Sequence, residues 1–227
     1  MAISHTSEFA ALLEALAAED LPHLKSMGRR ERRAAETRVR LFRCALQLFA
    51  ERGFPNVTVE DITEAADVGK GTFFNYFESK DDVLGVVAEI QLGKVREALQ
   101  QAEQGKTSIH SALHHLFQRV AEEPARSPDL ARALISSFLA SARIRKQMDH
   151  NMSEGRRMAA RMIELGQQRG EIDPAIKAER AALHLQQSFM GTLLLWSLRG
   201  EPKLHKAIEE TFQHFWRAIA FKREQQR

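Results

Sequence analysis

The sequence has little of several residue types that mark particular protein classes. It holds one cysteine, Cys44, six prolines and twelve glycines in 227 residues. One cysteine excludes an internal disulfide, and the low proline and glycine content excludes collagen-like and largely disordered chains. The longest nearly apolar run, residues 189–198, is shorter than the roughly 20 residues that a membrane-spanning helix needs. The first residues show no basic segment followed by an apolar one, so we expect no secretory signal and a cytoplasmic protein.

Net charge is also small, but it is unevenly distributed. The formal net charge is +3, whereas residues 29–43 contain seven arginines against Glu31 and Glu36. The preceding residues 1–28 are acidic, with one lysine against four carboxylates. An arginine cluster that runs into a helix, here with Arg32 and Arg33 among its members, is typical of a phosphate-binding arm. A solvated helix start, with arginines paired to the two glutamates, is the alternative interpretation.

Helical periodicity accounts for nearly the whole sequence, and no strand pattern of useful length is present. From residue 36 to 52, apolar residues recur at the i, i+3, i+4, i+7 spacing of one buried stripe. Cys44 lies beside this stripe, which favours a buried, inert thiol over a redox sensor. An amphipathic pattern over residues 8–24 is compatible with a further helix, whose role stays open. The sequence predicts an all-α fold with helices over residues 36–52, 58–66, 70–76, 80–103, 108–122, 128–140, 143–168, 175–199 and 203–222.

Local signals define the ends of the first helices. Gly53 is placed to end helix 36–52, and Thr58 with Asp61 resembles a capping box that starts the next helix. Residues 67–69 predict a tight turn. Ser79 is a favourable N-cap for helix 80–103, whose first turn carries two aspartates.

Residues 58–77 therefore predict a helix, a short turn and a second short helix. This is the helix-turn-helix arrangement, in which the second helix enters the DNA major groove and the first braces it. Phe73 and Phe77, four residues apart, should anchor the second helix in a core with Ile62, Phe49 and Val68. The alternative is a three-helix packing unit that never meets DNA.

The same segment is similar to a known family. The strings TVEDI and ADVGKGTFFNYFESK, within residues 58–80, and the preceding LFAERGF resemble the DNA-binding domain of the TetR family of bacterial regulators. The resemblance covers residues 36–84. It implies a helix-turn-helix DNA-binding domain over residues 34–79, preceded by an extension with a basic arm over residues 1–33. Residues 80–227 would form a helical ligand-binding and dimerisation domain.

The resemblance implies DNA contacts at Thr58, Thr72, Phe74, Tyr76 and Lys80. The chemistry of the second helix adds others, because a glycine permits close backbone approach and a lysine can bind guanine or phosphate. A lysine in the first turn of helix 80–103 is also expected to bind phosphate together with the backbone amides. The candidate DNA-binding residues are Arg32, Arg33, Thr58, Lys70, Gly71, Thr72, Phe74, Asn75, Tyr76 and Lys80.

Three features depart from the family pattern. The family often has a small hydroxyl residue at the position of Gly69 and tyrosine at that of Phe74, so two phosphate hydrogen bonds are missing. Helix 58–66 also carries Glu60, Asp61 and Glu64, which form an unfavourable surface beside DNA. The electrostatic contact is therefore expected from the arginines of residues 29–43 and from the two lysines.

The resemblance assigns effector binding and dimerisation to residues 80–227. Helices 175–199 and 203–222 are apolar on more than one face, which favours a homodimer formed through both; a buried pair in a monomer is the alternative. Aromatic, sulfur-containing and basic side chains of the middle helices are candidates for an effector pocket, although each also suits an ordinary core or a solvated basic turn. These candidates are His114, Phe117, Phe138, Arg143, Met148, Met152 and Met162.

No pattern supports catalysis. The sequence lacks a G-x-S-x-G motif, a phosphate loop and a dinucleotide fingerprint. His110 and His114 share a helix face but have no third ligand to complete a metal site. We expect no enzymatic activity, no cofactor and no metal.

The sequence as a whole predicts a TetR-like transcriptional regulator, expected to be a repressor. It would bind a palindromic operator in double-stranded DNA as a homodimer, and a small-molecule effector would release it; no membrane partner is expected. Two alternatives stay open. One is an all-helical ligand-binding or adaptor protein with a vestigial helix-turn-helix, and the other is a ligand-independent activator.

Overall fold

The computed structural model describes residues 28–122, 124–126, 128–140 and 142–221. Within these residues the structure is helical, and the one β-type pairing is an isolated bridge between Ile172 and Ala220. This confirms the predicted all-α fold. The predicted helix over residues 8–24 lies outside the described residues. The described elements are α3 (Arg29–Arg52), η1 (Phe54–Asn56), α4 (Val59–Ala65), α5 (Lys70–Phe74), α6 (Lys80–Glu103), α7 (Ile109–Ala121), η2 (Pro124–Arg126), α8 (Pro128–Ala140), α9 (Ala142–Gln168), α10 (Ala178–Arg199) and α11 (Leu204–Ile219).

The main difference from the predicted helices is the start of α3. It begins at Arg29 rather than at residue 36, so the arginine cluster continues the helix instead of preceding it. The apolar stripe begins only at Ala35 and Val39, and the periodicity therefore could not show the earlier turns. Arginine is a good helix former, and the Glu31 carboxylate accepts a hydrogen bond from the Gly28 N–H at 3.1 Å, which caps the start.

The backbone packs into two compact units. Of the described residues, the first unit comprises those from 28 to 93 together with those in Ala133–Met148, and the second comprises those in Lys94–Arg132 together with those from 149 to 221. Helices α6, α8 and α9 each contribute a part to both units. No described helix is both long enough and apolar enough to cross a membrane.

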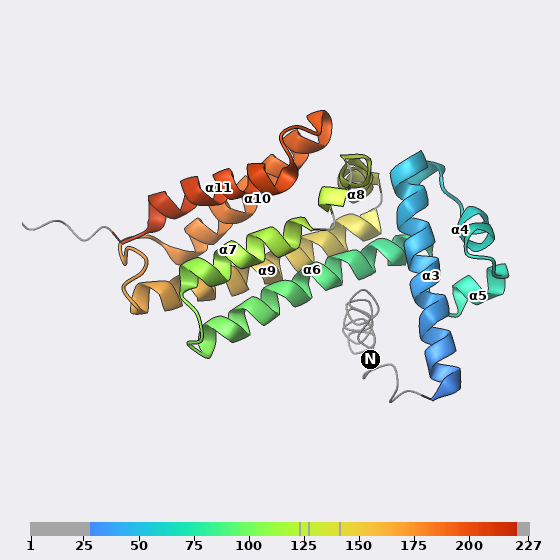
Figure 1. Cartoon of the computed structure of the whole chain (residues 1–227), viewed down its shortest axis with the longest axis horizontal. Coiled ribbons are helices and arrows are strands. Elements are labelled where there is room, and N and C mark those ends of the chain that lie inside the picture. Colours follow the sequence, from blue (N-terminus) through green and yellow to red (C-terminus); the bar gives the residue numbers. More distant parts are fainter. Residues whose placement is uncertain (1–27, 123, 127, 141, 222–227) are drawn as a thin grey trace, which may run out of the picture. The chain divides into compact units, whose positions relative to one another are not determined.

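In the first unit, α4 and α5 pack beside the C-terminal half of α3 (Figure 1). The α3 helix ends at Gly53, whose φ of 79° lies in the region that favours glycine and whose N–H bonds the Phe49 carbonyl at 3.0 Å. The η1 turn then places Phe54 against Phe49, with ring centroids 5.0 Å apart. The α3 side chains buried in this core are Ala35, Val39, Leu41, Phe42, Ala45, Leu48 and Phe49.

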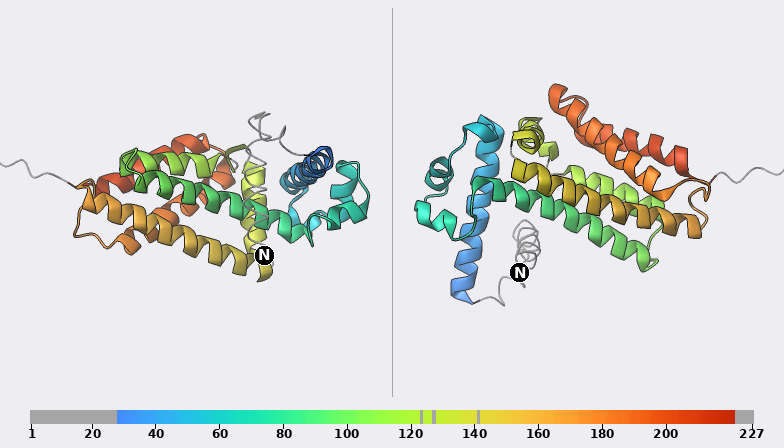
Figure 2. Two further views of the ribbon diagram at one scale, coloured as in Figure 1. Left: turned by 90° about the horizontal axis from the view of Figure 1, so that it is seen from below. Right: turned by 180° about the vertical axis from the view of Figure 1, so that it is seen from behind.

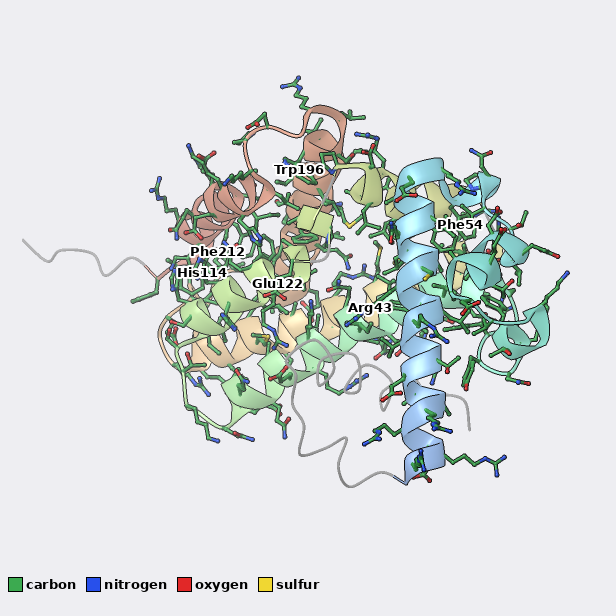
Figure 3. The ribbon with its side chains drawn as sticks, turned by 45° about the vertical axis from the view of Figure 1, so that its right-hand side comes forward. Arg43, Phe54, His114, Glu122, Trp196 and Phe212 are labelled. Carbon is green, nitrogen blue, oxygen red and sulfur yellow. The ribbon has the colours of Figure 1, made fainter. Side chains whose placement is uncertain are left out.

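In the second unit, α10 and α11 lie side by side and α11 also packs on α7 (Figure 1, Figure 2). Phe212 of α11 is fully buried, and its ring centroid lies 5.1 Å from that of His114 and 5.7 Å from that of Phe117 (Figure 3). The Phe117 ring in turn meets that of Phe189 from α10, at 5.3 Å. This aromatic cluster joins the three helices.

Candidate nucleic-acid interface

The short helix α5 is held in place by two aromatic anchors. Phe73 is fully buried and Phe77 nearly so, and their ring centroids are 5.4 Å apart. Ile62 of α4 and Phe49 of α3 are buried in the same unit, as the spacing predicted, whereas Val68 is only half-buried. A five-residue helix has little stability of its own, so its position depends on this packing.

The turn between α4 and α5 sets the direction of α5. Asp67 has a φ of 49°, a left-handed conformation in which aspartate is enriched among non-glycine residues. Its N–H bonds the Glu64 carbonyl at 3.1 Å, and the Val68 N–H bonds the Thr63 carbonyl at 3.0 Å. Gly69 follows as the N-cap of α5 in an extended conformation. The predicted tight turn over residues 67–69 is confirmed.

The opposite side of α5 faces solvent. Lys70, Gly71 and Asn75 are exposed, Thr72 and Tyr76 are half-buried, and Phe74 retains 50% of its accessible surface. A Cβ added at Gly71 would meet no atom within 4 Å, so packing within the chain does not require glycine there. An exposed phenylalanine beside a bare glycine is a surface suited to close contact with another molecule.

The N-terminus of α4 is closed by a reciprocal capping box. The Thr58 hydroxyl accepts from the Asp61 N–H at 3.1 Å, while the Asp61 carboxylate accepts from the Thr58 N–H at 2.7 Å and from its hydroxyl at 2.6 Å. Arg52 also donates to this carboxylate, at 3.1 Å. The hydrogen bonds from Thr58 are the main reason that the pKa of Asp61 is lowered. The predicted capping box is confirmed, and it engages the Thr58 hydroxyl within the protein.

Lys70, the first residue of α5, forms an ion pair with Glu60 of α4. Both side chains are exposed, at 57% and 61%. The hydrogen bond from Lys70 is the main cause that lowers the pKa of Glu60. Lys70, the one lysine among the candidate DNA-binding residues that lies on α5, is therefore partly neutralised by Glu60 of α4.

Lys80 is engaged with the η1 turn. Its Nζ donates to the carbonyl oxygens of Phe54 at 2.9 Å and Val57 at 2.8 Å, and lies 3.4 Å from that of Pro55. The ammonium also lies 4.6 Å from the centroid of the Phe54 ring. In this arrangement Lys80 orders the connection between α3 and α4. Phosphate binding by Lys80 stays a prediction.

The start of α6 differs in detail from the expected cap. The Ser79 hydroxyl is buried without a hydrogen-bond partner, and it is the Asp82 carboxylate that accepts from the Ser79 N–H, at 2.9 Å. The Asp82 carboxylate also forms an ion pair with the Arg143 guanidinium of the same unit, at 2.7 Å, and that guanidinium lies 3.3 Å from the Glu78 carboxylate. Arg143, predicted for an effector pocket, is thus paired with two carboxylates.

The arginine cluster lies along the N-terminal half of α3. Arg32 and Arg33 are exposed, and Arg32 has an ion pair of 3.7 Å with Glu36. Arg40 and Arg43 are also exposed, and Figure 3 labels Arg43 on this helix. Only one of these four side chains has a described acidic partner within the structure. The helix therefore offers a cationic surface to solvent.

The predicted effector residues fall in both units. Phe138, Arg143 and Met148 belong to the first unit, and each is half-buried or exposed. In the second unit Met162 is fully buried core, and Phe117 belongs to the aromatic cluster. Met152 and His114, the other two candidates, are half-buried. The Met152 carbonyl accepts from the Gln186 amide at 2.9 Å, and the His114 ring is hydrogen-bonded to the Glu209 carboxylate.

His114 also lines a groove between α6 and α7 that the sequence did not indicate. The groove has a volume of about 360 Å³ and includes Lys94, a residue that is 6% exposed. A lysine among the buried positions of α6 is the one sequence signal that could have pointed to it. Among the described residues, no group of three or more His, Cys, Asp or Glu side chains could hold a metal ion.

Cys44 is half-buried on α3. Its Sγ lies 3.5 Å from the Ala65 carbonyl oxygen, to which the thiol donates. Burial raises the pKa of the Cys44 thiol, which therefore stays protonated near neutral pH.

Comparison with known proteins agrees with the geometry of α4 and α5. Residues 41–87 match the family model described as bacterial regulatory proteins, tetR family. This segment is therefore similar to the DNA-binding domain of the TetR family. The transcriptional regulator TcmR of Streptomyces glaucescens is 46% identical over 56 residues, which are 25% of this chain and 25% of TcmR. The TetR-family match is therefore strongest in the helix-turn-helix.

Longer similarities extend over the second unit at lower identity. The A-factor receptor protein of Streptomyces griseus is 25% identical over 197 residues, which are 84% of this chain and 66% of that protein. The SmeT–triclosan complex, of the Stenotrophomonas maltophilia efflux-pump repressor, has a TM-score of 0.70 at 19% identity and covers 83% of this chain and 93% of SmeT. At that identity the likeness shows that the two chains share a fold.

Proposed function

We propose that this TetR-family chain is a transcriptional repressor that binds a palindromic operator as a homodimer and is released by a small-molecule effector. The observation that carries the proposal is the division of α5 into two sides. Phe73 and Phe77 fix one side in the core, while Gly71, Phe74 and Asn75 lie open on the other. This is the arrangement that a recognition helix needs to present side chains to base edges in the major groove.

The charge of the first unit supports DNA as the partner. The exposed arginines of α3 provide the sequence-independent contact with phosphates that supplies much of protein–DNA affinity. Arg32 and Arg33 are proposed to bind phosphate, and residues 1–33 with 34–79 are proposed as arm and DNA-binding domain. Thr58, Thr72, Tyr76 and Lys80 remain candidates for phosphate or base contacts.

Dimerisation is proposed through α10 and α11. A two-fold dimer places two recognition helices about 34–36 Å apart, and it therefore reads a palindrome. The α10 helix buries Leu193 and Trp196 in its own unit but leaves Leu194, Leu195 and Leu198 exposed by 45%, 61% and 65%. Such an apolar patch on a soluble surface is typical of a protein–protein contact.

Release by an effector is proposed for residues 80–227. SmeT, which shares the fold, has been solved with triclosan, and this supports a small-molecule site in the helical region of the present chain. A ligand that binds one subunit arrangement more tightly than another would shift the population away from the DNA-binding arrangement. The identity of the effector is left to experiment.

The proposal is tested by selecting bound sequences from random duplex DNA with the full-length protein. We expect an inverted repeat whose half-site centres are one helical turn or a multiple apart. Phe74→Ala should weaken binding to the selected operator about tenfold or more, because a lost base contact costs about 1–3 kcal/mol. Phe221→Ala is the matched control, since Phe221 is similarly exposed, at 47%, but lies after α11. Failure to enrich any sequence at low salt would favour the adaptor with a vestigial helix-turn-helix.

A further inference from the structure

The groove between α6 and α7 lies wholly within the second unit. Its volume of about 360 Å³ falls in the range of small-molecule sites. The α6 side contributes a lysine, an alanine and a glutamine at helical spacing, and the α7 side and its preceding turn contribute the rest. The lining residues are Lys94, Ala98, Gln101, Thr107, Ser111, Ala112, His114, His115, Leu116 and Arg119.

The groove holds a nearly buried ammonium. Lys94 is 6% exposed, and its Nζ donates to the Arg119 carbonyl oxygen at 2.8 Å. The Glu122 carboxylate lies 3.6 Å from the same nitrogen, beyond hydrogen-bond distance, and its side chain is 55% exposed. An ammonium carries three hydrogens, and burial of a charge is costly unless those hydrogens are bonded. With one of the three hydrogens on the Arg119 carbonyl, the ammonium has donor capacity for two further acceptors.

The charges that face the groove are of one sign. Lys94 and Arg119 are in the lining together with two histidines, and none of the lining residues is a carboxylate. The acidic partners Glu97, 2.6 Å from Arg119, and Glu122 stand outside the lining. An anion in the groove would lie beside both cations, while Glu97 keeps its contacts with Arg119 and with Gln101, whose amide donates to it at 3.2 Å.

Neutral side chains in the lining add a hydrogen-bond donor and apolar surface. The Ser111 hydroxyl accepts from the Ser108 hydroxyl at 2.9 Å and keeps its own hydrogen for an oxyanion, whereas the Gln101 amide already donates to Glu97 at 3.2 Å. Ala98, Ala112 and Leu116 offer apolar contact. The N-terminal amides of α7 are already engaged, because Ile109 N–H bonds the Glu171 carboxylate at 2.8 Å and His110 N–H lies 3.3 Å from it. The site therefore consists of side chains, not of a helix terminus.

We propose that this groove binds a small organic anion, with a carboxylate or phosphate head group on Lys94 and a short apolar part along Ala98, Ala112 and Leu116. The site is separate from the recognition surface of α5. Anion binding to the groove can be measured without an operator, so its test does not depend on the proposed repressor function.

Isothermal titration of the full-length protein with inorganic phosphate and with hexanoate, at constant ionic strength, tests the proposal and separates the two head groups. Gln101→Glu places a carboxylate in the lining without touching Lys94 and should weaken binding at least fivefold. Gln104→Glu, an exposed change of the same kind three residues along the chain and outside the lining, should leave the affinity within twofold. Lys94→Met should abolish binding, with Lys106→Met as its exposed control.

The arginines of α3 also attract phosphate and must be separated from the groove. Arg32→Gln combined with Arg33→Gln should leave hexanoate and phosphate binding to the groove unchanged. Loss of binding in this double variant but not in Gln101→Glu would overturn the proposal. So would equal effects of Gln101→Glu and Gln104→Glu, or no heat from either ligand at millimolar concentrations. If Lys94→Met fails to fold, the pair of glutamine variants still decides the question.

Discussion

At the scale of single residues, the pairing of Lys70 with Glu60 has the clearest consequence for DNA binding. Both groups are more than half exposed, so the pair adds little to stability. Its effect is instead on the charge that α5 presents. A phosphate that approaches Lys70 must compete with a carboxylate already bonded to it. If the chain binds DNA as proposed, Glu60 would compete with the phosphates of the operator for Lys70.

Glu60→Gln should increase operator affinity by a few-fold. The change frees the ammonium of Lys70 for phosphate, so the slope of log affinity against log salt should become steeper by up to about 0.9. Fluorescence anisotropy with a labelled operator at several salt concentrations measures both quantities. Glu64→Gln removes the same charge from exposed α4 surface without touching Lys70. Identical gains in the two variants would show that only the overall charge of α4 matters.

The residue scale also shows what sequence could and could not predict. The two sides of α5 were predicted because the i, i+4 spacing of Phe73 and Phe77 is a local property. The partner of Lys70 is on a different helix, ten residues away, and the acceptors of Lys80 are backbone carbonyls of η1. Contacts of this kind depend on how elements fold against each other, and periodicity carries no information about them.

At the scale of elements, the capping box of α4 links the recognition surface to pH. The lowered pKa of Asp61 means that its ionised form is favoured in the folded state. This contribution to stability is fully present above the ordinary pKa of 3.8 and is lost as the pH falls through the lower, folded-state value. Because α4 supports α5, acid should loosen the helix-turn-helix locally.

Asp61→Asn should reduce the protection of α4 amides in native-state hydrogen exchange at pH 7. The difference from the unmodified protein should shrink as the pH falls below 3.8, since the unfolded chain then takes up a proton at Asp61 before the folded chain does. Thr58→Ala removes the other half of the capping box and should cost about 1 kcal/mol. A difference between Asp61→Asn and the unmodified protein that stays constant from pH 7 to pH 3 would contradict the assignment.

Element boundaries were predicted well where a cap or an apolar stripe marks them. The limits of α6 and α8 match the predicted helices 80–103 and 128–140, and those of α7, α9, α10 and α11 differ from their predictions by at most three residues. The start of α3 differs by more, because its first two turns are polar and arginine-rich and have no buried side to reveal. Helix propensity, not amphipathicity, sets that boundary.

At the scale of the whole molecule, sequence predicted the class of fold and which side of α5 is buried. It predicted neither the groove nor which of the effector candidates lie in the same unit. The apolar and sulfur-containing side chains chosen for a pocket divide between the two units, with Met162 in the core of the second and Phe138 in the first. Composition identifies residues suited to a pocket. Which of them share a cavity depends on helix packing, which a single sequence does not specify.

The exposed leucines of α10 are the reason to expect a dimer through this helix. Leu195 and Leu198 are 61% and 65% exposed, on the same helix whose Leu193 and Trp196 are buried in their own unit. Water contact with such a patch is unfavourable by roughly 25 cal/mol for each Å² of apolar surface. A second copy of the chain would remove this surface from water, and a two-fold contact would use the same patch of leucines on both subunits.

Leu195→Glu should therefore convert a dimer into a monomer, because the new carboxylate would be buried in the subunit contact without a charged partner. Sedimentation velocity should report about twice 25.8 kDa for the unmodified protein and 25.8 kDa for the variant. Gln168→Glu adds the same charge at an exposed position of α9 and should stay dimeric. The monomeric variant should bind the palindrome far more weakly while a single half-site binds as before, since each recognition helix is intact. A dimer that survives Leu195→Glu would move the interface away from this patch, and an unmodified protein that sediments as a monomer would favour the buried helix pair over a subunit contact.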